Sequence, residues 1–220
     1  MQTDMTVGKP MKMLLNFTIP VFLGNVFQQL YSMADAVIVG KFVGTKGLAA
    51  VGATGTITFL IIGFLMGVTT GVTVLTSQKF GAGRMDEMRK TVGNAAILSA
   101  VIAVVMTAVS MLGMHRLLVF MHTPEDIFDG AYGYIMIICA GIFTQVLYNL
   151  VSSILRALGN SKTPLYFLIL AAGLNIVLDL VFIIFFHWGA PGAAWATVIS
   201  QGVSGVLCLI YMWKAVPELK

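Results

Sequence analysis

The sequence predicts an all-α integral membrane protein, a bundle of six transmembrane helices. Of its 220 residues, 58% are hydrophobic and 10% are charged, and the mean hydropathy is +0.93, which excludes a water-soluble globule of ordinary composition. The apolar runs are long and lack the alternation typical of the strands of a membrane barrel. Basic residues lie at the ends of these runs, so the net charge of +4 indicates membrane topology and not binding of nucleic acid.

Six apolar segments each approach or exceed the roughly 20 residues that cross a bilayer. They are residues 14–40, 51–76, 92–114, 131–155, 164–187 and 193–213. We expect them to form a single transmembrane lobe over residues 1–220, surrounded by membrane lipid.

The 13 basic residues are unevenly divided between the two ends of these spans. One side would hold Lys9, Lys12, Lys79, Arg84, Arg89, Lys90, Arg156, Lys162, Lys214 and Lys220, and the other side Lys41, Lys46 and Arg116. The positive-inside rule therefore predicts a protein of the cell membrane with both termini in the cytoplasm.

The first span holds Pro20 and Asp35, and both residues are costly there. Proline removes a backbone donor and bends a helix, and an ionisable group inside a bilayer indicates a functional site. Asp35 belongs to a polar stripe that must face protein or water. This stripe comprises Gln28, Tyr31, Ser32 and Asp35. The alternative is that Asp35 caps the helix end at the membrane interface, since Lys41 follows six positions later.

The second span contains Gly63, Gly67 and Gly71, whose four-residue spacing predicts a seam on which another helix packs. After it, residues 78–90 read QKFGAGRMDEMRK. We expect the glycines to end the helix and the remainder to form a short basic amphipathic segment at the cytoplasmic surface.

The fifth span repeats the anomaly of the first, because Asn175 and Asp179 share one face of an otherwise apolar helix. No Lys or Arg lies inside any of the six spans, so each aspartate must be protonated, hydrogen-bonded or bound to a cation. Counted from the outer helix ends, Asp35, Asp179 and Thr197 lie about 9, 12 and 8 Å deep. Tyr134, near the outer start of the fourth span, can reach the same layer.

Other candidate sites have weaker support. Cys139 and Cys208 lie in apolar segments, where a thiol is a small hydrophobic group, so we infer neither a disulfide nor a metal site. His115 and His122 lie in an outer loop without further ligands, which favours solvated residues over a bound metal.

Five motifs in chain order resemble the multidrug and toxic compound extrusion (MATE) transporters. They are IPVFLGNVFQQLYSMADAVIVGKFVGTKGLAAVG, QKFGAG, RALGNSKTP, NIVLD and GAAWATV, and they cover nearly the whole chain. The resemblance implies two pseudo-symmetric six-helix lobes around a cavity, and antiport of drugs or organic cations against H+ or Na+, with no other cofactor and no enzymatic activity. It implies a cation site formed by Asp35, Asn175, Asp179 and Thr197, supported by Gln28 and Tyr134, and a bend of the first helix at Pro20.

One departure from the family pattern is large. The pattern runs to about twelve helices, whereas this chain ends at Lys220 after six predicted spans. It therefore resembles the N-terminal lobe, and we expect either a fragment or a lobe that pairs with a second six-helix lobe or with a second copy.

Three other functions are alternatives to transport of drugs or organic cations. A flippase for lipid-linked anionic saccharides would favour cationic residues inside the spans, which the sequence lacks. A truncated membrane protein without transport activity stays open. An intramembrane protease with Asp35 and Asp179 as its dyad is disfavoured, because the Y-D and G-x-G-D contexts of such enzymes are absent.

Overall fold

The computed structural model describes residues 10–219 and consists of helices and short connections, without a strand in that range. Lys9 and Lys220, which contribute to the predicted charge bias, lie outside the described residues. The α-helices are α1 Pro10–Phe42, α2 Thr45–Gly81, α3 Met85–Phe120, α4 Glu125–Ala140, α5 Ile142–Ala157, α6 Lys162–Leu180 and α7 Gly189–Ala215. Two short elements complete the fold, the π-helix η1 Val181–Phe185 and the 3₁₀-helix η2 Pro217–Leu219.

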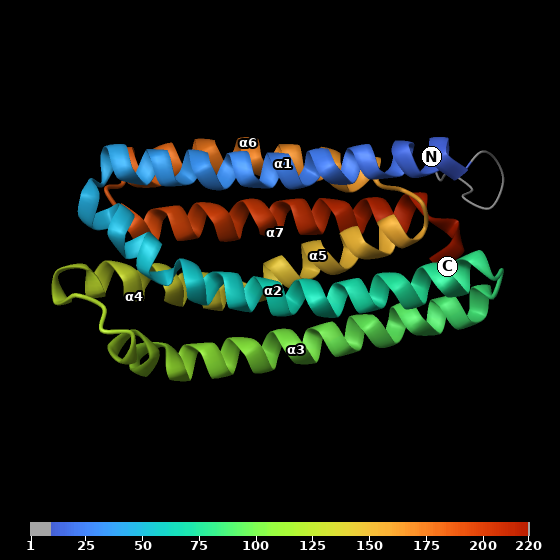
Figure 1. Cartoon of the computed structure of the whole chain (residues 1–220), viewed down its shortest axis with the longest axis horizontal. Coiled ribbons are helices and arrows are strands. Elements are labelled where there is room, and N and C mark those ends of the chain that lie inside the picture. Colours follow the sequence, from blue (N-terminus) through green and yellow to red (C-terminus); the bar gives the residue numbers. More distant parts are fainter. Residues whose placement is uncertain (1–9, 220) are drawn as a thin grey trace.

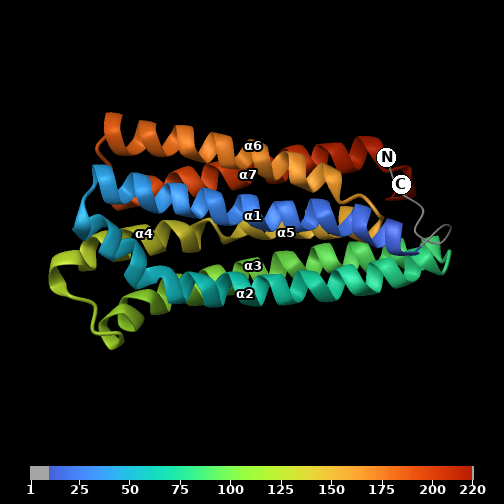
Figure 2. The same cartoon turned by 45° about the horizontal axis from the view of Figure 1, so that its top comes forward.

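The helices form an elongated bundle with α7 and the pair α4 and α5 at its centre (Figure 1). The helices α1 and α6 lie side by side on one side of this centre, and α2 and α3 lie on the other (Figure 1). In the turned view α2 and α3 again lie together along one side (Figure 2). Helix α7 packs extensively on α5. This packing is close because α7 presents small residues: a Cβ added at Gly205 would lie 3.2 Å from the backbone nitrogen of Tyr148.

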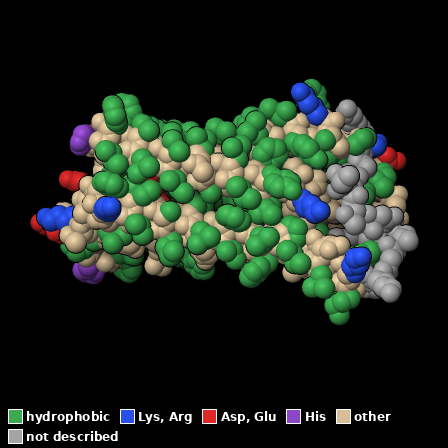
Figure 3. All heavy atoms as spheres, turned by 90° about the horizontal axis from the view of Figure 1, so that it is seen from above, with side chains coloured by type: hydrophobic (Ala, Val, Ile, Leu, Met, Phe, Trp, Pro, Cys, Tyr) green, Lys and Arg blue, Asp and Glu red, His purple; other side chains and the backbone are tan. Residues whose placement is uncertain are grey.

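The described residues include five helices that are long and apolar enough to cross a membrane, or six if α4 and α5 together count as one span. Charged side chains gather toward the two ends of the molecule, and a mostly hydrophobic belt lies between them (Figure 3). The start of α1 and the end of α7 lie at the same end of the bundle (Figure 1). The prediction of an all-α membrane bundle is confirmed.

The predicted span 131–155 is not one helix in the structure. It is divided at Gly141 into α4 and α5, whose axes differ by 46°. At this break the backbone lies against α7, because a Cβ at position 141 would be 2.2 Å from Cγ2 of Val198. Glycine is therefore required at position 141, where α4 ends and α5 begins.

The predicted span 164–187 also changes character before its end. The α-helix α6 ends at Leu180, and the next five residues form the π-helix η1. Asp179 thus lies in the last turn of regular α-helix, directly before the wider turn. Single π-helical turns are frequent at functional sites.

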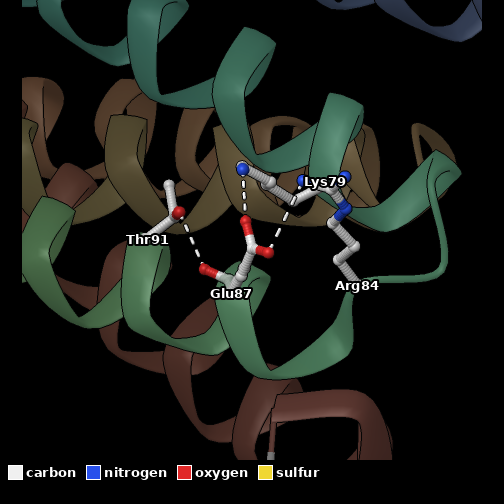
Figure 4. A network of polar contacts seen from close by, with 4 residues as sticks. All are labelled: Lys79, Arg84, Glu87 and Thr91. Carbon is white, nitrogen blue, oxygen red and sulfur yellow. Dashed lines mark hydrogen bonds and ion pairs between the residues drawn. The ribbon is translucent and has the colours of Figure 1, made fainter.

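Within residues 78–90 the glycines end the second helix as predicted, but the remainder is not a separate amphipathic segment, because it opens the next helix. The helix α2 continues to Gly81 and α3 begins at Met85. Glu87 of α3 contacts Lys79 of α2 and lies 3.6 Å from Arg84, as Figure 4 shows. Such exposed ion pairs contribute about 0–1 kcal/mol each, so the contacts orient this turn more than they stabilise the bundle.

The glycine seam of α2 does not pack within the described part of the chain. A Cβ added at Gly63, Gly67 or Gly71 would meet no atom within 4 Å, and all three residues are exposed. The prediction that these glycines support packing against another helix is therefore wrong for residues 10–219.

Candidate cation site

Two acidic side chains from distant parts of the sequence meet between α1 and α6. Asp35 lies on α1 and is 8% exposed, and Asp179 lies on α6 and is fully buried. Their carboxyl groups are close enough for their charges to interact. Two buried negative charges that interact in this way favour a proton or a bound cation at the pair. Asp35 is therefore an interior residue, and the alternative of an interfacial cap does not fit its burial.

Asn175 and Thr197 form the second part of this site. Asn175 lies one turn before Asp179 and is 1% exposed, and its Nδ2 donates a hydrogen bond of 3.3 Å to Oγ1 of Thr197 on α7. This contact fixes the amide, so that its nitrogen faces α7 and its carbonyl oxygen faces elsewhere.

Four buried oxygen atoms of these residues have no hydrogen-bond donor within residues 10–219. They are Oδ1 of Asp35, Oδ1 of Asn175, and Oδ1 and Oδ2 of Asp179. Buried polar atoms are rarely left without a partner. Carboxylate, amide and hydroxyl oxygens are ligands for hard cations, so the donor set fits either a proton or Na+. It does not fit a zinc-type site, since the described residues contain no cluster of three or more His, Cys, Asp or Glu.

Tyr134 and Gln28 also lie at this site, Tyr134 beside the two acids and Gln28 in the cavity wall. Tyr134 of α4 is 7% exposed and close enough to Asp35 and Asp179 to interact with their charges. Gln28 lies two turns before Asp35 and lines the same cavity of about 200 Å³.

Three further amide side chains line this cavity and were not predicted as site residues. They are Gln145 and Asn149 of α5 and Gln201 of α7, and Tyr31 of the predicted stripe lines the same cavity. The sequence holds a signal for them, because Gln145 and Asn149, like Thr197 and Gln201, are spaced i and i+4 in an apolar helix.

Pro20 is buried inside α1, and the helix continues through it from Pro10 to Phe42. The helix is unbroken at this position, and the role of Pro20 as a bending point stays a prediction.

Arg156 directly follows the predicted span 131–155 and anchors a helix end. It occupies the last turn of α5, is partly buried, and lines a second, smaller cavity beside α1.

Comparison with known proteins gives a consistent pattern. A family model described as MatE matches residues 20–181. The chain is 33% identical over 211 residues to the probable multidrug resistance protein YpnP of Bacillus subtilis, a match that covers 96% of this chain and 47% of that protein. The chain thus spans about half the length of this relative.

Solved structures agree in fold. A transporter of the MOP superfamily from Pyrococcus furiosus superimposes with a TM-score of 0.89 at 29% identity, covering 96% of this chain and 46% of that one. A crystal structure of MATE in the bent conformation superimposes with a TM-score of 0.87 at 30% identity, covering 94% of this chain and 46% of that one.

Proposed function

Because this chain belongs to the multidrug and toxic compound extrusion (MATE) family, we propose that it forms the N-terminal half of a secondary transporter. The transporter would export drugs or organic cations across the cell membrane in exchange for H+ or Na+, with both termini of this chain in the cytoplasm. Relatives described as multidrug resistance proteins and transporters support this class of function over an enzyme.

The observation that carries the proposal is the buried pair Asp35 and Asp179. Two carboxylates in one pocket of low dielectric cannot both stay charged without a partner. No basic residue among those described pairs with either acid. The pocket would therefore take up a proton or Na+ from one side of the membrane and release it to the other as access changes.

The position of the acids suggests how cation binding would reach the substrate cavity. Asp35 lies on α1, which also holds Pro20 and lines the cavity of about 200 Å³. Cation binding changes the cost of burying Asp35, so it shifts the equilibrium between arrangements of α1. Bending at Pro20 would follow that shift, and a solved relative described in a bent conformation supports the idea.

The driving force is sufficient for export. Inward movement of one positive charge across 100 mV releases about 2.3 kcal/mol, which sustains roughly a fiftyfold gradient of a neutral substrate per charge. Methionines such as Met66, which is exposed on α2, would supply adaptable apolar contacts for substrates of different shape.

A second six-helix lobe, or a second copy of this chain, would complete the cavity. The chain covers 46% of the matched Pyrococcus furiosus structure, and the exposed seam of Gly63, Gly67 and Gly71 offers a surface on α2 for close helix packing.

Efflux of ethidium from proteoliposomes would test the proposal. The chain is reconstituted, ethidium is loaded, and an inward gradient of H+ or Na+ is imposed. We expect efflux with the wild type, loss of efflux with Asp35→Asn or Asp179→Asn, and no change with Asp129→Asn, which alters an exposed acid on α4. Equal efflux with Asp35→Asn would refute the assigned role of the acid pair, and no efflux with the wild type would refute transport by this chain with itself as partner.

A further inference from the structure

A second polar cavity lies between α1, α5 and the start of α6. Its volume is about 50 Å³, whereas one water molecule needs roughly 10–15 Å³, so it admits a group of a few atoms. Its polar lining comprises Asn25, Gln28, Tyr148, Asn149, Arg156 and Ser161. This lining differs from that of the cation site in one respect: it contains a guanidinium group and no carboxylate.

Arg156 is a partly buried cation without an acidic partner in the part of the chain that the structure describes. Its Nε donates a hydrogen bond of 3.2 Å to the carbonyl oxygen of Ser152, one turn earlier. None of the ion pairs within residues 10–219 includes it. A guanidinium presents five N–H groups in a planar fork, and burying such a cation without an anion is costly. The cavity therefore has a positive charge that an anion would balance.

The rest of the lining suits an anion attached to an apolar body. The side-chain amide of Asn25 and the hydroxyl of Ser161 supply further donors, while Met66, Leu165 and Leu168 supply apolar walls. The small cavity also shares Gln28, Tyr148 and Asn149 with the larger cavity. A molecule with its charged group at Arg156 thus has space along α1 for its remaining atoms.

We propose that Arg156, with Asn25 and Ser161, forms a binding site for the oxyanion group of an amphipathic molecule, a phosphate or a carboxylate. The planar fork of arginine matches both groups with two parallel hydrogen bonds. The site is separate from the Asp35 and Asp179 pair and does not require cation coupling, so it goes beyond the proposed function. It also supplies the partly buried cationic residue that an anionic cargo would need.

Calorimetric titration of the purified chain in a neutral maltoside detergent would test the site. The probes are decyl phosphate, inorganic phosphate and decanol. Decyl phosphate carries both the anion and an apolar body, inorganic phosphate carries the anion alone, and decanol carries the apolar body alone. We expect decyl phosphate to bind, Arg156→Gln to weaken its binding at least tenfold, and Arg156→Lys to weaken it less. The control Arg116→Gln, an exposed residue at the other end of the bundle, should leave the affinity unchanged.

A second variant keeps the test informative if Arg156→Gln does not fold. Asn25 is an exposed residue of α1 that lines the cavity, and Asn25→Asp places a negative charge there. This variant should weaken binding of decyl phosphate while helix content by circular dichroism stays the same. Binding of inorganic phosphate with the same loss in Arg156→Gln would support the oxyanion site, with the free ion as its ligand. Equal binding of decanol, or unchanged affinity in Arg156→Gln, would overturn the proposal, as would no binding by the wild type.

Discussion

Asn175 has two separate roles in the candidate cation site. Its Nδ2 donates to Thr197, and its Oδ1 is buried without a donor among the described residues. The first contact holds the side chain in one orientation, and the second atom is then available as a ligand. A proton needs only a carboxylate, whereas Na+ needs several oxygen atoms around it, so this carbonyl oxygen matters more for Na+ than for H+.

Replacement of Asn175 by Leu should therefore weaken the binding of Na+ more than the binding of a proton. The change removes the carbonyl oxygen and leaves a side chain of similar volume. We expect binding of radioactive Na+ to the purified chain to fall about tenfold, the effect of roughly 1.4 kcal/mol, while proton uptake at the acid pair changes little. The matched control is Asn94→Leu, which alters an exposed residue on α3. If Asn175→Leu reduced Na+ binding and proton uptake equally, the result would contradict a role of Asn175 as a Na+ ligand.

The sequence was informative about charged residues of this site and less so about neutral ones. Asp35 and Asp179 stand out because an ionisable residue in an apolar helix is costly wherever the helix faces. Gln145 and Gln201 were missed because a neutral amide in a helix is unremarkable until its neighbours are known. Their proximity to the acids depends on how α5 and α7 pack, which no local pattern encodes.

The break between α4 and α5 is the least predictable feature at the scale of helices. Residues 131–155 form one long, mostly apolar run, and Gly141 is one of 23 glycines, many of which lie inside unbroken helices. What distinguishes it is the approach of Val198 from α7. The bend is therefore a tertiary effect, whereas membrane-length helices follow from hydropathy alone.

Replacement of Gly141 by Ala tests this explanation of the bend. The new Cβ would lie 2.2 Å from Cγ2 of Val198, so one helix must shift, at a cost of roughly 1–3 kcal/mol. Thermal unfolding in detergent should show a lower midpoint for Gly141→Ala, and the double variant with Val198→Ala should recover part of the loss. The control Gly113→Ala on α3, where a Cβ meets no atom within 4 Å, should be neutral. A Gly141→Ala protein as stable as this control would show that the close approach does not require glycine.

At the scale of the whole molecule, helices that line the cavity also carry exposed apolar faces. The cavity of about 200 Å³ has walls from α1 and α2, the two helices with some of the most exposed apolar side chains, such as Phe22 and Phe59. Hydropathy alone cannot distinguish a face exposed to lipid from one covered by a second lobe, because both are apolar. The glycines of α2 are more specific, since small residues permit close contact between helices in a membrane.

Two leucine substitutions distinguish a glycine that faces lipid from one that contacts a second lobe. Gly67→Leu on α2 and Gly113→Leu on α3 both place a large side chain where no atom lies within 4 Å, so neither should lower the unfolding midpoint of the isolated chain. If α2 contacts a second lobe or a second copy, Gly67→Leu alone should block that contact and lower the assembled fraction severalfold. Chemical crosslinking in native membranes, followed by light scattering of the purified protein, measures this fraction. Equal assembly of the two variants would place the interface on another face, because a leucine cannot fit into a seam built on glycine.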